Sequence, residues 1–338
     1  MGSELWLRYN LRGGGLAVST AALTAVAIEQ AVWAERHGFD VVTMGEHHGT
    51  EDGYLPSPMI VGAAMAARTK RIRFNMGAIL LPLLNPLRVA EDVCVFDNVS
   101  NGRVDITAGA GYVPSEFDMF GVDYRQRIRS MEEGIATLRA AFSGTPFDYQ
   151  GRRVRISPAP VQPGGPKIMI GGGVTAAALR AARIGDGFFP TVAKPELLAC
   201  YHAECARLGR ASGRVVTAGA GFIHVSHDPE RDWQRIGRHL LHDLNAYAKW
   251  ARESGAVTPY LEDVSDIEAL KKTGVYLVLT PDECLAFMQA ERAADRSVMF
   301  NPLCGGLHPD LAWESLELLA AEVLPRYGQV PVRPAAAN

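Results

Sequence analysis

The feature that most constrains the fold is a regular alternation of two kinds of segment. Short apolar segments with the period of a β-strand are followed by longer amphipathic segments with the period of a helix. A strand that is followed by a helix returns to its sheet as a parallel strand, so the alternation predicts an α/β fold with a parallel sheet. The predicted strands are 5–9, 40–44, 71–80, 104–108, 167–170, 187–190, 215–226 and 297–301.

Eight strand–helix units favour a closed (β/α)8 barrel, the TIM barrel. Several of the strands are short, so an open doubly wound sheet remains the alternative. A hairpin is expected at 147–156 around Gly151, and Ser19 or Thr20 is expected to cap the first helix. The segment 229–270 is helical in pattern but breaks the rhythm, which suggests an insertion before the last barrel unit that could roof the pocket. We expect one domain over 1–329 and a disordered tail over 330–338.

Composition narrows the classes of function. With 48% hydrophobic and 21% charged residues and a formal net charge of −3, the chain resembles a soluble domain, and neither nucleic acid nor membrane is an expected partner. No signal peptide is apparent, and polar residues interrupt the apolar stretch 16–34 too often for a membrane span. The five cysteines are scattered without a C-x-x-C pair, which fits a reducing, cytoplasmic location.

In a barrel the loops that follow the strands meet at one mouth, where the active site lies. Glu46-His47-His48 follows the second strand directly. Adjacent residues on extended backbone point to opposite sides, so one histidine should face the pocket, and no metal site is predicted. That imidazole could act as a general base or orient an anionic intermediate. The alternative is that the trio only fixes the loop.

Small residues gather at the same mouth. Met76-Gly77-Ala78 lies at the third strand, and Gly109 and Gly111 lie at the fourth, which suggests that a planar ligand rests against these two strands, although glycine can also mark a bulge. Gly171-Gly172-Gly173-Val174-Thr175 closes a strand and opens a helix. Free amides at such a helix N-terminus suit a phosphate group. A tight strand–helix turn is the other interpretation of this glycine run.

The chain resembles the bacterial luciferase-like monooxygenase family in an ordered series of short runs that covers most of its length. The runs are Gly38-Phe39-Asp40, Glu46-His47-His48, Pro56-Ser57-Pro58, Thr69-Lys70-Arg71-Ile72-Arg73, Leu81-Pro82 before Asn85-Pro86, Ala90-Glu91-Asp92, Asp97 before Ser100-Asn101-Gly102-Arg103, Gly109-Ala110-Gly111-Tyr112, Glu116-Phe117, Gly171-Gly172-Gly173 and Asp186-Gly187.

This resemblance implies a (β/α)8 barrel that binds reduced FMN, usually supplied by a separate flavin reductase. In the family, reduced flavin reacts with O2 to a C4a-peroxide that oxygenates a small organic substrate such as an aldehyde, ketone or amine. Some relatives instead use the deazaflavin F420 for hydride transfer. Relatives are often homodimers that pack through early barrel helices, so a homodimer is expected here as well.

The resemblance also implies roles for individual residues. His47 stands where the family has its catalytic base, and the Gly77–Ala78 bond stands where the family often has a non-prolyl cis peptide under the flavin. Glu46, His48, Tyr112 and Glu116 are expected to border the substrate. Gly109 replaces the reactive cysteine of luciferase, which argues against light emission.

Three alternatives to an FMN-dependent monooxygenase remain. An F420-dependent oxidoreductase would need a basic groove for the acidic tail of that cofactor, whereas the loop after the fourth strand carries Glu116, Asp118 and Asp123, with Arg125 nearby. A flavin-binding protein without catalysis is a second alternative. A metal-dependent hydrolase is the third, and it lacks further ligands beside Glu46, His47 and His48 in the sequence.

Overall fold

The computed structural model describes residues 4–13, 18–255 and 264–328. The predicted tail at 330–338 lies outside these ranges. Within them no helix is both long enough and apolar enough to cross a membrane.

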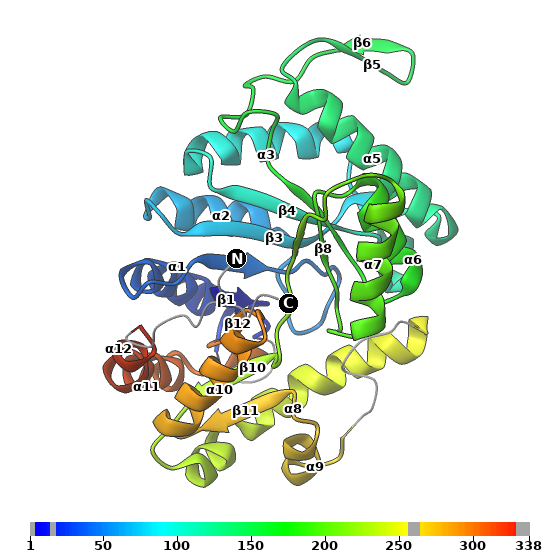
Figure 1. Cartoon of the computed structure of the whole chain (residues 1–338). Coiled ribbons are helices and arrows are strands. Elements are labelled where there is room, and N and C mark those ends of the chain that lie inside the picture. The colour runs from blue at the N-terminus through cyan, green and yellow to red at the C-terminus, as the bar shows by residue number, and fades with distance from the viewer. Residues whose placement is uncertain (1–3, 14–17, 256–263, 329–338) are drawn as a thin grey trace.

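Eight parallel strands form one curled sheet, as predicted (Figure 1). In spatial order they are β12 (Val298–Phe300), β1 (Leu5–Tyr9), β2 (Val41–Met44), β3 (Arg73–Leu80), β4 (Val104–Gly109), β7 (Ile168–Gly171), β8 (Gly187–Phe189) and β9 (Arg214–Val215). The two edges meet beyond β9, where Ala218 forms a parallel bridge with Ser297 and the Ser297 amide donates to the Thr217 carbonyl at 2.8 Å. The sheet therefore closes into the barrel.

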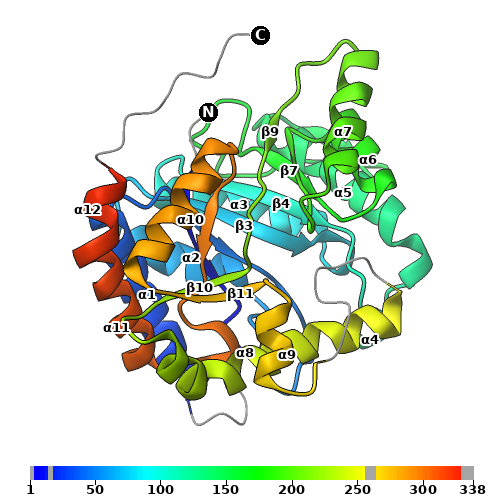
Figure 2. The same ribbon diagram turned by 60° about the horizontal axis from the view of Figure 1, so that its bottom comes forward.

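Helices follow the strands and cover the outside of the barrel (Figure 2). They are α1 (Thr20–Arg36), α2 (Pro58–Ala67), α3 (Pro86–Ser100), α4 (Pro114–Phe120), α5 (Arg127–Phe142), α6 (Thr175–Ile184), α7 (Pro195–Arg207), α8 (Pro229–Ser254), α9 (Ile267–Lys272), α10 (Pro281–Ala293), α11 (Pro309–Leu318) and α12 (Leu324–Tyr327). Many begin with proline, which lacks the amide that the first turn leaves unpaired. Ser19 caps α1 through the Ala22 amide, as predicted.

The chain departs from the sequence prediction after β9. The single strand predicted at 215–226 is wrong, because Gly219 and Gly221 separate β9 from β10 (Phe222–Val225). Strand β10 pairs with β11 (Tyr276–Leu279), a strand that the sequence analysis missed, in a separate two-stranded parallel sheet. The expected helical insertion corresponds mainly to the 26-residue helix α8. The hairpin is present as β5 (Phe147–Tyr149) and β6 (Arg152–Val154).

Arg103 joins three elements at the amino-terminal end of β4, and it is a buried side chain. Its guanidinium donates five hydrogen bonds, one to the Thr69 hydroxyl and four to the main-chain carbonyls of Ala66, Thr69, Ile72 and Ser100. The group thus satisfies carbonyls at the ends of α2 and α3 and before β3. Buried carbonyls that lose such a donor are costly.

Replacing Arg103 should therefore destabilise the barrel. We expect Arg103→Ala to lower the free energy of unfolding by about 3–5 kcal/mol, because it leaves several buried acceptors without a hydrogen-bond donor at once. Urea unfolding followed by circular dichroism measures the change. Arg125→Ala, at a side chain that is 94% exposed, is the matched control and should be nearly neutral. Equal effects for both variants would contradict this role for Arg103.

Candidate functional site

The predicted loops do meet at the carboxyl-terminal end of the barrel. The segment after β2 carries Glu46, His47 and His48, and α4, after β4, carries Glu116. The C-terminal half of α8 lies against the same loops, through contacts that Tyr247 and Trp250 make with His47. The site is therefore built from consecutive barrel loops and from one helix distant in sequence.

His47 is a buried imidazole held by a carboxylate. Its Nδ1 lies 2.8 Å from Glu116 Oε1, and the same oxygen accepts the His48 amide at 2.7 Å. Because a carboxylate only accepts, Nδ1 carries the proton and Nε2 keeps its lone pair. Burial lowers the pKa of His47, and the hydrogen bond and charge of Glu116 oppose that shift only in part. The geometry thus presents a neutral histidine, suited to accept a proton at Nε2.

His48 contacts a different carboxyl group. Its Nε2 donates to Glu46 Oε1 at 2.9 Å, and its ring lies edge-on to Phe120. Burial raises the pKa of Glu46, against the opposing effect of His48. In the described parts of the chain no group of three His, Cys, Asp or Glu side chains is placed to hold a metal ion.

All four predicted substrate-binding residues are engaged with one another or with His47. Glu46 pairs with His48, and Glu116 pairs with His47, so these side chains position the histidines. Tyr112 lies edge-on to the His47 ring with centroids 5.6 Å apart. Substrate contact by any of the four stays a prediction.

Small residues form a floor beside this histidine. A Cβ added to Gly109 would lie 2.9 Å from Ala78 Cβ, and one added to Gly171 would lie 3.8 Å from that same atom. The ends of β3, β4 and β7 therefore approach closely around Ala78, and larger side chains would fill the space. The Gly77–Ala78 peptide bond is cis, as expected from the resemblance.

A polar layer lies beneath the floor inside the barrel. Asn75 Oδ1 accepts from the hydroxyls of Thr43 and Thr107, at 3.4 and 3.2 Å. The Asn75 Nδ2 is buried without a hydrogen-bond partner. A buried donor without a partner next to a floor of small residues fits a site that receives a polar ligand edge.

Two predicted cofactor residues are placed differently. The Met76 side chain is fully buried in the core cluster that also contains Met44 and Phe96, so it can offer only its backbone to a ligand. Gly111 adopts a positive φ, and a Cβ there would lie 2.8 Å from the Phe117 ring. Its small size thus serves the packing of Phe117.

The glycine run after β7 forms an open loop at the N-terminus of α6. A Cβ on Gly172, which has φ +152°, would lie 2.6 Å from Ala177 Cβ. Gly173 is half-buried, whereas Val174 and Thr175 are exposed, and no side chain caps the helix. The amides of Thr175 and Ala176 therefore remain available for an anion, whereas the Ala177 amide already donates to the Val174 carbonyl at 2.9 Å.

Four aromatic side chains surround His47. The Trp250 indole stacks on the imidazole at 4.3 Å between centroids, and Tyr54, Tyr112 and Tyr247 approach it edge-on at 4.8, 5.6 and 6.2 Å. We refer to Tyr54, Tyr112, Tyr247 and Trp250 as the aromatic box. The sequence analysis did not identify Tyr54, Tyr247 or Trp250. It expected the segment 229–270 to roof the pocket, but nothing local shows which side chains of α8 reach His47.

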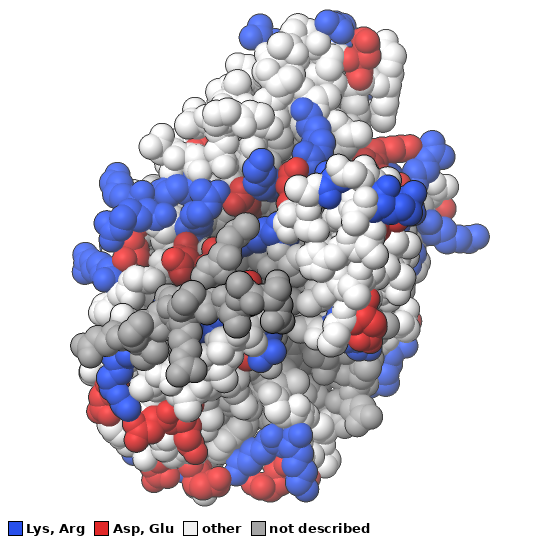
Figure 3. Space-filling model, viewed as in Figure 1, with Lys and Arg blue, Asp and Glu red and all other residues white. Residues whose placement is uncertain are grey.

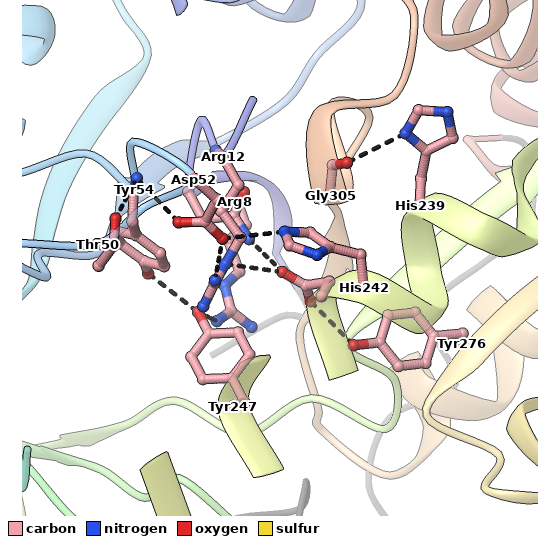
Figure 4. A network of polar contacts seen from close by, with 12 residues as sticks. Arg8, Arg12, Thr50, Asp52, Tyr54, His239, His242, Tyr247, Tyr276 and Gly305 are labelled. Atoms are coloured by element: carbon pink, nitrogen blue, oxygen red, sulfur yellow. Dashed lines mark hydrogen bonds and ion pairs between the residues drawn. The ribbon is translucent and has the colours of Figure 1, made fainter. Parts of the chain in front are cut away.

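The aromatic box is fixed by Arg12, a guanidinium that is 1% exposed (Figure 4). Its Nη1 forms an ion pair with Asp52, and its Nε lies 3.3 Å from Asp243 on α8. It also lies 4.7–4.8 Å from the ring centroids of Tyr54, Tyr247 and Trp250. Arg12 thus connects the loops after β1 and β2 to α8.

Further polar contacts complete this network. Burial alone would raise the pKa of Asp52, but the hydrogen bond from His242 and the charge of Arg12 hold it well below its usual range. The other carboxylate, Asp243, accepts from Asn10 Nδ2 at 2.7 Å and from the Tyr276 hydroxyl at 2.9 Å. The sequence analysis missed this network as well. An unusual Arg12 directly after a strand was the one available signal.

A separate cavity of about 480 Å³ opens at the opposite, amino-terminal end of the barrel strands, where Arg73, Asp105 and Arg214 line it. Two of its arginines are already paired, Arg73 with Asp105 and Arg214 with Glu4. That end of a barrel serves stability. The candidate site is therefore the histidine end.

Comparisons with known proteins agree with this architecture. The profile of the family described as luciferase-like monooxygenase matches residues 12–293. An uncharacterized protein, y4vJ of Sinorhizobium fredii, is 31% identical over 59% of this chain, and the match spans 56% of that protein's length. Limonene 1,2-monooxygenase of Rhodococcus erythropolis is 26% identical over 87% of this chain and 79% of its own length.

Two solved structures share the fold. The oxygenating constituent of 3,6-diketocamphane monooxygenase of Pseudomonas putida, in complex with FMN, has a TM-score of 0.72 at 19% identity, covering 98% of this chain and 100% of its own. An F420-dependent secondary alcohol dehydrogenase has a TM-score of 0.70 at 15% identity, covering 96% and 99%.

The protonation state of His47 can be measured directly. We expect NMR titration to give His47 a pKa below the usual 6.5, because burial disfavours the imidazolium. Glu116→Gln should lower this pKa further, since it removes the charge that favours protonation. His227, an exposed surface histidine, serves as the internal control that Glu116→Gln should leave unchanged. A His47 pKa above 6.5 would contradict the neutral base.

Proposed function

Because this chain belongs to the luciferase-like monooxygenase family, we propose that it is a flavin-dependent monooxygenase, an oxidoreductase that uses reduced FMN and O2 to oxygenate a small organic substrate. The observation that carries the proposal is the buried His47, whose Nδ1 lies 2.8 Å from Glu116 and whose pKa is lowered by burial, in a site that also holds a floor of small residues. Reduced flavin would supply the electrons for oxygen activation.

The residues present fit such a cofactor. The floor around Ala78, Gly109 and Gly171 would receive the flat ring, with the unpaired Asn75 amide beneath it. The loop Gly172–Thr175 would receive the phosphate at the N-terminus of α6. His47 Nε2 would hold or accept a proton at the substrate side, and the aromatic box would exclude water.

An F420-dependent oxidoreductase is the second candidate, because an F420-dependent dehydrogenase shares the fold at a similar TM-score. The region after β4 offers little to an acidic cofactor tail. Arg125 is exposed there and lies 3.9 Å from Asp123, and Arg127 stacks on Tyr124. This argues for FMN. A flavin-binding protein without catalysis would not need the His47–Glu116 pair.

The partners follow from the same proposal. Reduced FMN would be delivered by a separate flavin reductase in the cytoplasm. A homodimer through α2 and α3 would cover three exposed apolar side chains on these neighbouring helices, Ile60, Val95 and Val99.

Cofactor choice is tested by anaerobic titration of the purified chain. We expect reduced FMN to bind and F420 to bind at least about tenfold more weakly. Thr175→Val should weaken the binding of reduced FMN by about tenfold, because one charge-assisted hydrogen bond to the phosphate is lost. It should leave the binding of reduced riboflavin, which lacks the phosphate, unchanged. Tighter binding of F420 than of reduced FMN would overturn the choice of cofactor.

Oxygenation is tested with ¹⁸O2, a flavin reductase, and limonene and cyclohexanone as probes. We expect one ¹⁸O atom in the product. His47→Ala should lower turnover by about 100-fold or more, as expected for a lost general base, while flavin binding is kept. His227→Ala, at an exposed histidine, is the matched control. Flavin binding without ¹⁸O incorporation into either probe would count against a monooxygenase.

A further inference from the structure

The compartment around His47 carries an excess of buried carboxyl groups. Glu46, Asp52, Glu116 and Asp243 are each at most 7% exposed. Two guanidiniums face them. Arg12 is paired with Asp52 and Asp243, while its Nη2, among the rings of the aromatic box, has no hydrogen-bond partner in the described residues. Arg8 donates to the Tyr247 hydroxyl at 3.3 Å. Even if burial keeps Glu46 protonated, three carboxylates stand against these two guanidiniums, and the imidazoles of His47, His48 and His242 also contact the carboxyl groups.

The neighbouring parts of the sequence do not reverse this balance. Segments 14–17 and 256–263, which flank the compartment's elements in the chain, contain neither lysine nor arginine. On the last turns of α8, Lys249 and Arg252 have exposed side chains. An anionic ligand brought next to His47 would therefore meet net negative charge at low dielectric, where repulsion is poorly screened.

The surface offered to a ligand is otherwise aromatic. Within the aromatic box, Tyr112 and Trp250 are half-buried and keep part of their surface accessible, whereas Tyr54 is buried. Aromatic walls with few polar groups bind apolar rings well. The charge of the compartment and its aromatic walls thus both favour an uncharged ligand that carries an apolar ring.

We infer that the compartment around His47 accepts uncharged, ring-bearing substrates and rejects carboxylates and phosphates. Asp243, with Asp52, sets the charge selection, and Trp250 supplies the packing wall. The inference rests on the proposed function only in taking this compartment as the substrate site. The phosphate of the cofactor is not affected, because its loop lies at the N-terminus of α6.

The test uses three ligands that share one ring system: 2-naphthol, 2-naphthoate and 2-naphthyl phosphate. Their affinities for the full chain are measured by calorimetry at pH 7, with and without bound FMN, and 2-naphthyl phosphate is compared only with FMN bound, because its phosphate could otherwise occupy the loop at the N-terminus of α6. We expect 2-naphthol to bind at least about tenfold more tightly than 2-naphthoate, and 2-naphthyl phosphate to bind most weakly. Equal or tighter binding of either anion, or no binding of 2-naphthol, would overturn the inference.

Two variants test the roles of Asp243 in charge selection and of Trp250 in packing. Asp243→Asn should lower the ratio of the affinity for 2-naphthol to the affinity for 2-naphthoate at least about threefold. Asp105→Asn, at the opposite end of the barrel, should leave this ratio unchanged. Trp250→Ala should weaken 2-naphthol about three- to tenfold, with Trp313→Ala as the remote control. An unchanged ratio in Asp243→Asn would refute its role. The comparison of ligands in the unmodified chain stands even if a variant fails to fold.

The two proposals fail separately. If reduced FMN does not bind but the ligand preference holds, the flavin proposal is wrong and the substrate selection stands. If flavin binds and the anions bind best, only the substrate selection is wrong.

Discussion

The ion pairs of Arg12 hold the site together. One guanidinium, buried at the end of the first strand, binds Asp52 in the next loop and approaches Asp243 from α8. A buried charge of this kind is tolerable only with its partners in place, so the three segments are fixed together or not at all. The position of Trp250 over His47 follows from this constraint, because α8 carries both Asp243 and Trp250.

The site divides its tasks between two parts of the fold. The barrel strands provide a rigid floor of backbone and small side chains around Ala78. The loops and α8 provide the titratable and aromatic side chains that contact His47 in the described part of the chain. Such a division lets the floor stay suited to one cofactor while substitutions in α8 alter which substrate is admitted.

Much of the fold and part of the site could be predicted from sequence. The strand–helix alternation and the ordered motifs indicated the barrel and the cis bond at Gly77–Ala78, because these depend on local pattern. The catalytic role of His47 stays a prediction. Arg12, Tyr247 and Trp250 could not be predicted, since their contacts join residues up to 239 positions apart, as between Arg8 and Tyr247. The single strand expected at 215–226 failed because Gly219 and Gly221 redirect the chain to pair with a later strand.

The closure of the barrel has a mechanical consequence. Neighbouring strands from β12 to β8 share three or more paired positions, and β8 and β9 share two, whereas the ring is completed by the single bridge of Ala218 to Ser297. This seam is the part of the ring with the fewest hydrogen bonds, so breathing of the barrel should start there. The segment from β10 to β11, which includes α8, connects the two sides of the seam. The floor of small residues lies between β3 and β7, and paired strands separate it from the seam on both sides, so opening at the seam would leave the strand pairs of the floor intact.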